Sequence, residues 1–295
     1  MICDMHVHTR HSGMCTLPIL GRFCRESYND PLAVYQTLKR LGMTLVTITD
    51  HDSIDGAEPL RGFPDFFLSE EVTCRMPSGK QVHVGVYGIT ERNHVEIQRR
   101  RADLVSLLIY LTEKRILFSV NHVFSALTGR RSSSDFEWWQ SYFPAYESLN
   151  ASMPATVNKK ANALAAAQRK IEIGGSDSHS MIPLGRAWTE VRGARIPHEF
   201  LSGLRAGQGE VHGTSGNAFT LARDLFLVGT GMMRERSWTL LLAPLAAFLP
   251  IVSAVHSAHE EIFARRWFVR ACNASSRRET SPLCNSAPTP REVLA

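Results

Sequence analysis

The sequence predicts an α/β fold in which a mainly parallel sheet closes into a (β/α) barrel. Up to about residue 190, segments with strand character alternate with segments of helical periodicity, which is typical of βα units in a parallel sheet. Residues able to bind a metal follow one predicted strand after another. In barrels of this kind the functional site lies at the carboxyl ends of the strands, so this placement favours a closed barrel.

The chain begins with a strand, helix, strand unit. The opening strand leads into Asp4-Met5-His6-Val7-His8-Thr9, whose two histidines lie two residues apart and so point to the same side of a strand. After an irregular loop, Asn29-Asp30-Pro31 has the capping side chain and the proline of a helix start, and Gly42 ends that helix. The β-branched residues of 43–49 predict a second strand, which runs into Asp50-His51-Asp52.

The alternation continues to residue 179. Strand-like segments are expected at 66–73, 81–87, 116–120, 146–149 and 171–173, helices at 93–115 and 158–170, and a charged, aromatic loop at 130–139. Asn93 is expected to cap the longer helix. Ligand-type residues accompany these strands, namely Glu71, His83, His122, Asp177 and His179.

The barrel is expected to span residues 1–215, with a helical extension at 216–271. The tail, 272–295, is rich in Ser, Pro, Arg and Thr, and we expect it to be disordered. Within the extension, the run from Trp238 to Val255 is about as long as the shortest bilayer-spanning helices. Pro244 and Pro250 interrupt it, so a buried hairpin and a membrane span are both open alternatives.

The composition gives only general limits on function. The 295 residues are 44% hydrophobic and 21% charged, and the formal net charge is +5. This charge permits an anionic substrate, but no long basic tract or basic-aromatic motif typical of nucleic-acid binding occurs. The six cysteines show no CxxC spacing, and the N-terminus has no secretory pattern. We therefore expect a reduced, cytoplasmic protein, with membrane association through 238–255 as an open alternative.

The ligand-type residues predict a metal centre. Imidazoles and carboxylates without paired thiolates suit zinc, manganese or iron, and Glu71 could bridge two ions, although Glu70 competes for that role. Two ions about 3.5 to 4 Å apart suit hydrolysis of a phosphate ester by a metal-activated hydroxide. Arg186 could clamp a phosphate bidentately; a surface ion pair is the alternative.

Five strings of residues resemble the successive motifs of the polymerase and histidinol phosphatase (PHP) family. They are Asp4-Met5-His6-Val7-His8-Thr9, Thr49-Asp50-His51-Asp52, Glu71-Val72-Thr73, Asn121-His122 and Gly175-Ser176-Asp177-Ser178-His179, in the family's order. The resemblance covers roughly residues 1–190. It implies a distorted seven-stranded (β/α) barrel, a trinuclear metal site and a metal-dependent phosphoesterase that cleaves phosphomonoesters or phosphodiesters.

The resemblance also implies a role for each ligand. His6 and His8 would bind a first ion with Glu71 and Asp177, which makes these carboxylates catalytic residues. Glu71 would bridge to a second ion held by His83 and His122, and a third would lie between His51 and His179. The family supplies one further Asp or His shortly after the first motif, where this chain has His11-Ser12-Gly13-Met14-Cys15. His11 or Cys15 substitutes there, or the site holds two ions.

Two other functions remain open at this stage. One is a degenerate barrel that serves as a scaffold or binding module; the other is an amidohydrolase that acts on C–N bonds. Fold does not fix the substrate, so a small phosphorylated molecule, a nucleotide and an oligonucleotide are all compatible with the motifs, and no protein partner is indicated. Asp50 is expected to orient His51, and Asn150 to lie near the substrate.

Overall fold

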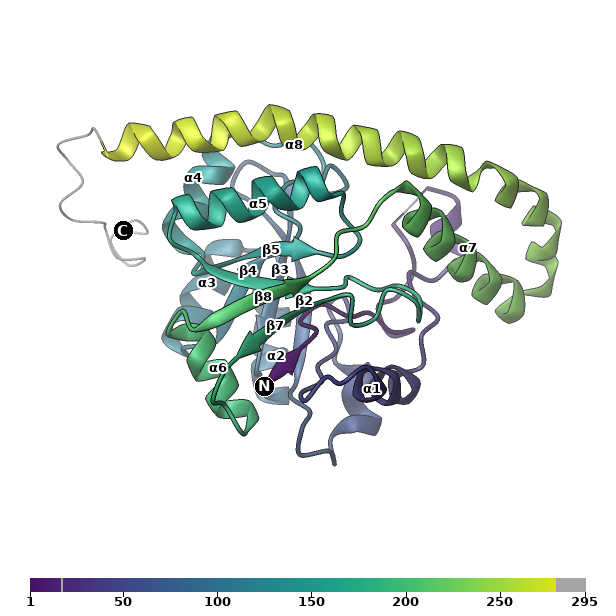
Figure 1. Cartoon of the computed structure of the whole chain (residues 1–295), viewed down its shortest axis with the longest axis horizontal. Helices are drawn as coiled ribbons and strands as arrows, with labels where there is room; N and C mark the ends of the chain where they lie inside the picture. The colour runs from purple at the N-terminus through teal and green to yellow at the C-terminus, as the bar shows by residue number, and fades with distance from the viewer. Residues whose placement is uncertain (17, 280–295) are drawn as a thin grey trace.

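Two β-sheets lie at the centre of the molecule in a computed structural model that describes residues 1–16 and 18–279 (Figure 1). The larger sheet has the order β2-β3-β4-β5-β6 and the smaller one the order β1-β7-β8. Their strands are β1 (Ile2–Cys3), β2 (Ser69–Arg75), β3 (Gln81–Tyr87), β4 (Leu117–Val120), β5 (Ala145–Asn150), β6 (Ile171–Gly175), β7 (Ala187–Val191) and β8 (Gly209–Gly213).

The larger sheet is mixed rather than mainly parallel. β2, β3 and β4 pair antiparallel, whereas β4, β5 and β6 pair parallel. The turn between β2 and β3 is closed by hydrogen bonds from Met76 N to Lys80 O and from Gly79 N to Met76 O. So short a connection can join only antiparallel strands, because a parallel crossover needs a dozen or more residues.

A regular seven-stranded barrel is not confirmed. Between β6 and β2 lie two irregular segments, 4–8 and 43–51, which form isolated bridges such as Val7 with Ser178 and Val46 with Phe66 instead of ladders. Threonine hydroxyls take the place of ladder partners here: Val7 N donates to Thr49 Oγ1 at 3.0 Å. Such side-chain bonds compete with regular pairing, so the strand predicted at 43–49 is absent although the segment lies beside both neighbours.

The α-helices are α1 (Pro31–Arg40), α2 (Glu91–Arg100), α3 (Leu104–Glu113), α4 (Ser133–Tyr142), α5 (Ala155–Ala167), α6 (Pro197–Arg205), α7 (Ala218–Glu235) and α8 (Leu249–Glu279). Three 3₁₀ segments complete the described elements: η1 (Leu20–Arg22), η2 (Asp55–Leu60) and η3 (Ser237–Phe248). α8 includes 272–279, and the rest of the tail expected to be disordered, 280–295, lies outside the described residues.

Capping residues explain why one helix prediction and one loop prediction were wrong. The single helix expected at 93–115 is two helices, because Asp103 accepts hydrogen bonds from Val105 N and Ser106 N and begins α3. Thr90 caps α2, and Asn93 returns a bond to it. The loop expected at 130–139 contains α4, which begins with a reciprocal capping box between Ser132 and Asp135.

The C-terminal half of α8 belongs to the main hydrophobic core. Figure 1 shows α8 running across α4 and α5, and Phe263, Ala264 and Trp267 are buried in the same cluster as Phe136. The helix therefore covers the sheet's outer helices and does not extend freely into solvent along this half.

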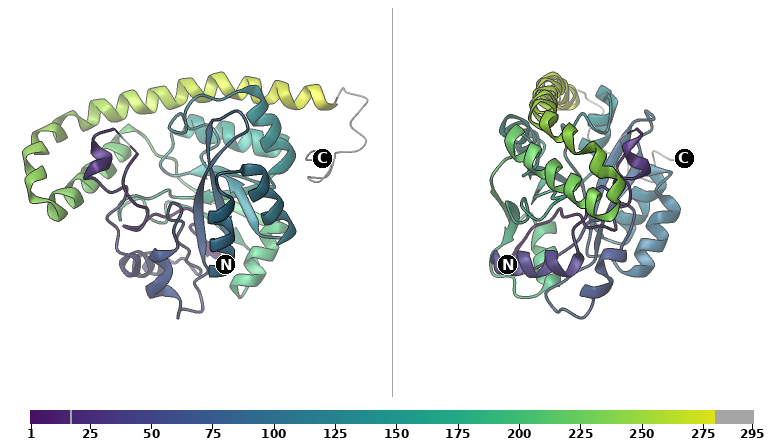
Figure 2. Two further views of the ribbon diagram at one scale, coloured as in Figure 1. Left: turned by 180° about the vertical axis from the view of Figure 1, so that it is seen from behind. Right: turned by 90° about the vertical axis from the view of Figure 1, so that its right-hand side faces the viewer.

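The run from 238 to 255 is largely exposed, so the buried hairpin, one of the two alternatives for this run, is wrong. It forms η3 and the start of α8, which lie with α7 beyond the sheets at one end of the molecule (Figure 2). Within the described residues, Ser237–Cys272 is one helical stretch long and apolar enough to cross a membrane by length and composition.

Candidate metal centre

Four side chains from three separate segments converge on one point. His6 and His8 lie on the irregular segment after β1, Glu71 on β2, and Asp177 just after β6, and all four are buried. His6 Nε2 lies 3.0 Å from His8 Nε2 and 3.2 Å from Glu71 Oε2. Asp177 Oδ1 lies 3.5 Å and 3.3 Å from the same two nitrogens. Ligands about 2.0 to 2.1 Å from a tetrahedral zinc ion are about 3.3 Å apart, so this spacing fits a bound cation.

Hydrogen bonds to the other ring nitrogens determine which atoms face this point. His6 Nδ1 lies 2.8 Å from Glu147 Oε1 and therefore donates to it. His8 Nδ1 donates to Ser12 Oγ at 2.9 Å, because that hydroxyl donates onward to Asp50 Oδ1 at 2.7 Å. With both tautomers assigned in this way, two Nε2 lone pairs and two carboxylates face one another, an arrangement that requires a positive charge between them.

The second carboxylate oxygen of Glu71, Oε1, faces another set of ligands. Glu71 Oε1 lies 3.2 Å from His122 Nε2 and 3.5 Å from His83 Nδ1, and these nitrogens are 3.3 Å apart. Asn121 Nδ2 donates to the same oxygen at 2.9 Å. The two oxygens of one carboxylate thus face different groups of imidazoles, as a carboxylate that bridges two ions must do.

A third set is completed by Glu26, which the sequence did not single out. His51 Nε2 lies 3.2 Å from Glu71 Oε2 and 3.5 Å from Glu26 Oε2. On the other side, His179 Nε2 lies 3.6 Å from Glu26 Oε1, and its Nδ1 donates to the carbonyl of Asp177 at 3.1 Å.

The chain doubles back on itself to bring Glu26 to this position. Cys15 N donates to Cys24 O, and Glu26 N donates to Gly13 O, so the end of the loop lies beside its start. The expectation that His11 or Cys15 supplies the missing ligand is therefore not met: no interaction given for the described residues joins either side chain to the cluster. The available signal was a carboxylate in the loop after the first motif, eleven residues beyond Cys15.

The electrostatics of the cluster match its shape. Burial alone would raise the pKa of Glu71, but His6, His51 and His83 hold it well below its usual value. Burial likewise opposes charge on Glu26, yet its bond to His179 and the charge of His51 lower its pKa to about 2. All the carboxylates of the three sets are thus anionic at neutral pH, which suits divalent cations.

The histidines respond to the same carboxylates. Burial would lower the pKa of His179, but Glu26 and Asp177 raise it to about 10. Burial dominates at His51, whose pKa falls to about 3. For His6, Asp177 and Glu71 outweigh burial and raise the pKa well above its usual value. The site therefore favours positive charge, which a proton or a metal ion can supply.

Residues around the ligands hold them in place. Glu147 receives the bond from His6 and also accepts from His122 N at 2.6 Å, so it connects the first and second sets. Asp50 accepts hydrogen bonds from the hydroxyl of Thr9 at 2.6 Å and from that of Ser12. The sequence predicted that Asp50 orients His51, but through Ser12 it orients His8 instead. Sequence reasoning missed Glu147, whose only signal is its position within the predicted strand at 146–149.

Backbone geometry at the ligands is unusual. His122 and Asp177 have positive φ angles of 31° and 51°, a conformation that non-glycine residues adopt at a cost of about 1 to 3 kcal/mol. Gly175 is required for the approach of β6, because a Cβ there would lie 2.4 Å from His6 Cβ. The fold thus accepts local strain to direct these side chains inward.

Three other residues singled out in the sequence differ in how they relate to the cluster. Arg186 Nη2 donates to Thr214 Oγ1 at 3.3 Å, and no ion pair or hydrogen bond given for the described residues joins it to a metal ligand. Glu70 pairs with His94 at 2.9 Å, away from the bridging position of Glu71. Asn150 is nearer the site, because its Nδ2 donates to Asp177 Oδ2 at 3.0 Å.

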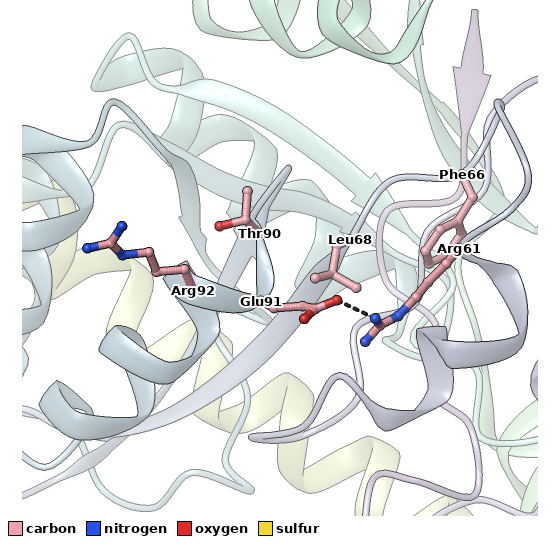
Figure 3. A pocket seen from close by; sticks show the side chains of 6 residues that line it. All are labelled: Arg61, Phe66, Leu68, Thr90, Glu91 and Arg92. Atoms are coloured by element: carbon pink, nitrogen blue, oxygen red, sulfur yellow. Dashed lines mark ion pairs between the residues drawn. The ribbon is translucent and has the colours of Figure 1, made fainter.

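A surface hollow lies elsewhere and contains no member of the three sets. It is lined by Arg61, Phe66, Leu68, Thr90, Glu91 and Arg92 (Figure 3). Arg61 forms ion pairs with Glu91 and Glu58, so its charge is compensated within the chain. We assign no chemistry to this hollow.

The fold and the three sets together define a class of protein. It is an α/β protein with a cluster of buried imidazoles and carboxylates that suits divalent metal ions. Groups such as His6, His8 and Asp177, or His6, Glu71 and His122, have ligand atoms within 4.8 Å of one another.

Comparison with known proteins shows what part of the chain, and its fold, are similar to. Residues 155–208 match the family model described as PHP-associated, and no curated protein matches the chain. A two-domain protein from Bacteroides vulgatus, containing a predicted PHP-like metal-dependent phosphoesterase, is similar in structure with a TM-score of 0.55 and 14% identity. The match covers 72% of this chain and 65% of that chain, which is less than two thirds of its length.

PsfC from Pseudomonas syringae is similar with a TM-score of 0.53 and 17% identity, over 80% of this chain and 98% of that chain. An amidohydrolase from Chromobacterium violaceum, solved with sulfate and no metal, has a TM-score of 0.47, 14% identity, and coverage of 71% and 97%. At these identities the first two likenesses establish the fold. The resemblance to the PHP family that the motifs predicted is confirmed by the family model and this fold.

Proposed function

We propose that the protein is a metal-dependent hydrolase of phosphate esters, with a monoester or a diester as its substrate. The observation that carries this proposal is the position of Glu71, whose two oxygens face two different groups of imidazoles. The proposal is supported by the similar fold of the Bacteroides vulgatus protein, which contains a predicted PHP-like metal-dependent phosphoesterase. When bound, two or three divalent ions of zinc, manganese or iron would polarise the ester and lower the pKa of water.

The chain's own residues hold this machinery in place. Glu71 and Asp177 would keep the ligand sets at a fixed separation. Asn150 donates a hydrogen bond to Asp177 Oδ2, the oxygen that does not face the first set. Glu147 accepts the Nδ1 proton of His6, so Nε2 is the ring nitrogen that would bind a metal. Burial of His6, His8 and Glu71 keeps water from weakening these electrostatic interactions.

Arg186 is our candidate for contact with the substrate phosphate. Its guanidinium bonds only weakly to the exposed hydroxyl of Thr214, which leaves it able to reorient toward an anion. An Arg186→Gln variant should show a raised KM with a smaller change in kcat, because it removes binding to the phosphate rather than a metal ligand.

The test is hydrolysis by metal-reconstituted protein. The panel contains p-nitrophenyl phosphate, bis-p-nitrophenyl phosphate, nucleotides, a short oligonucleotide and amides, with His8→Ala as the control. We expect turnover of at least one phosphate ester, lost in the control. Turnover of amides alone would make the protein an amidohydrolase, and no turnover by protein with full metal content would favour the scaffold or binding module.

A further inference from the structure

An apolar segment, 237–255, lies at one end of the molecule, and most of its large apolar side chains are exposed. No Asp, Glu, Lys or Arg occurs between Arg236 and Glu260. Leu241 is 83% exposed, Val255 66% and Ile251 63%. Trp238, Leu240, Leu245, Phe248 and Val252 are exposed as well. A monomeric soluble protein rarely shows so large a continuous apolar surface, which marks a binding site.

Both ends of this segment are fixed to the same globular body. At one end, Glu235 pairs with Arg25 at 2.7 Å, and the ring of Trp238 contacts that of Phe23 at 4.9 Å. At the other end, buried Glu260 accepts a hydrogen bond from Ala126 N at 2.8 Å. A segment held in this way cannot cross a bilayer, because its two ends would have to lie on opposite faces.

The N-terminal border of the segment is basic, although Glu235 lies between its arginines and pairs with Arg25. Arg234 and Arg236 precede it and are exposed, and Arg22 is exposed on η1, which lies beside α7 in both views of Figure 2. Trp238 stands between these arginines and the apolar residues, the position that tryptophan favours at a membrane interface. Basic residues at such a border attract anionic headgroups.

We propose that 237–255 is a membrane-docking segment that enters one leaflet of an anionic bilayer and returns on the same side. Its apolar residues are buried in the acyl region, and the flanking arginines lie at the headgroups. This surface binds the protein to a membrane without spanning it. We favour a membrane over a second copy of the chain as the partner of this surface. In a symmetric dimer the arginines of one copy would lie close to the arginines of the other and repel them.

The test is flotation of the full-length, metal-loaded chain with vesicles of phosphatidylcholine alone or mixed with phosphatidylglycerol. We expect binding to the anionic vesicles, reduced at least about tenfold by Leu241→Glu or Ile251→Glu, since a charge inside the bilayer is costly. Val95→Glu is the matched control, because Val95 is also exposed but lies on α2. Arg236→Glu should weaken binding to anionic vesicles.

The contradicting results are distinct. No flotation of the wild type, or equal flotation of Leu241→Glu and wild type, overturns the proposal. Suppose that light scattering shows a dimer, that Leu241→Glu dissociates it, and that the dimer does not float with vesicles. This result would assign the surface to a second copy of the chain. Near-ultraviolet circular dichroism and metal content, unchanged in the variants, establish that lost flotation is not lost folding.

Discussion

Glu26 reaches the ligand cluster from a loop, whereas the other carboxylates follow or occupy strands. Its oxygens lie 3.5 Å from His51 Nε2 and 3.6 Å from His179 Nε2. Because the backbone of Glu26 is fixed by Gly13 O, its position depends on the loop's own hairpin. The third set is therefore the one most sensitive to changes in this loop.

Glu26→Gln should remove one ion per chain and leave the others bound. An amide is a weaker ligand than a carboxylate, so affinity at the third set should fall by about 100-fold or more, beyond the effect of losing an outer partner. Metal content after dialysis measures this. Cys15→Ser is the control and should keep all ions; loss of an ion from Cys15→Ser, with none lost from Glu26→Gln, would contradict the assignment.

Glu147→Gln should weaken metal binding although Glu147 is not in contact with the ion. Its oxygens accept from His6 Nδ1 and His122 N, and outer partners of this kind typically contribute about 10- to 100-fold in affinity. Competition with a chelator of known affinity measures the change. An unchanged affinity, together with an unchanged pH dependence of binding, would show that Glu147 has only a structural role.

Metal binding should release protons at pH 7. In the metal-free chain, burial opposes charge on His179, but Glu26 and Asp177 raise its pKa to about 10, so this imidazole is protonated at pH 7. A ligand nitrogen must lose its proton, so affinity rises with pH up to the raised pKa. His51, with a pKa lowered to about 3 mainly by burial, contributes no proton.

Calorimetric titration in buffers of different ionisation enthalpy counts the released protons. We expect at least one proton per chain at pH 7. An observed enthalpy that is the same in every buffer would exclude a protonated His179 in the metal-free protein.

At the scale of elements, α8 connects the C-terminal extension to the second ligand set. Glu260 on α8 accepts the Ala126 backbone hydrogen bond, and Ser125 N donates to His122 O. The turn that carries His122 is thus held from one side by its own strand and from the other by α8.

Glu260→Ala should lower the free energy of unfolding by about 1 to 3 kcal/mol, because it leaves a partly buried backbone donor, Ala126 N, without its partner. Denaturant unfolding measures the loss. Glu261→Ala is the matched control on the same helix; it removes only a partly exposed ion pair with Arg265 at 3.6 Å and should cost under about 1 kcal/mol. Equal losses in both variants would mean that the turn does not depend on Glu260.

The elements that could be predicted from the sequence are those with local signals. α1 begins at the predicted proline, with Asp30 as its cap, and β4 and β6 occur where apolar runs indicated them. The segment 43–51 could not be predicted as irregular, because the hydroxyls of Thr44 and Thr49 replace ladder bonds only in the presence of residues 2–7. Tertiary contacts, and not β propensity, determined the conformation of that segment.

The same distinction holds for the site. Each predicted ligand lies within a predicted strand or a few residues after one, so its location needed only strand order. Glu26 and Glu147 required knowledge of a loop's path and of a ring's tautomer, which depend on contacts over long sequence separations.

At the scale of the whole molecule, the ligand cluster and the membrane-docking segment lie close to the same loop. The loop that supplies Glu26 also contains Arg25 and Phe23, which contact Glu235 and Trp238 beside the docking segment. Figure 1 shows α7 at the end of the molecule toward which the labelled strand β5 points. Docking would therefore bring the metal centre close to the membrane surface.

Metal stoichiometry tests the central claim most directly. Purified protein, reconstituted with zinc or manganese and dialysed, should contain two or three ions per chain by elemental analysis, and His8→Ala should contain fewer. Fewer than one tightly bound ion in folded wild-type protein would contradict the account, because the converging lone pairs of His6 and His8 would then serve some purpose other than binding a cation.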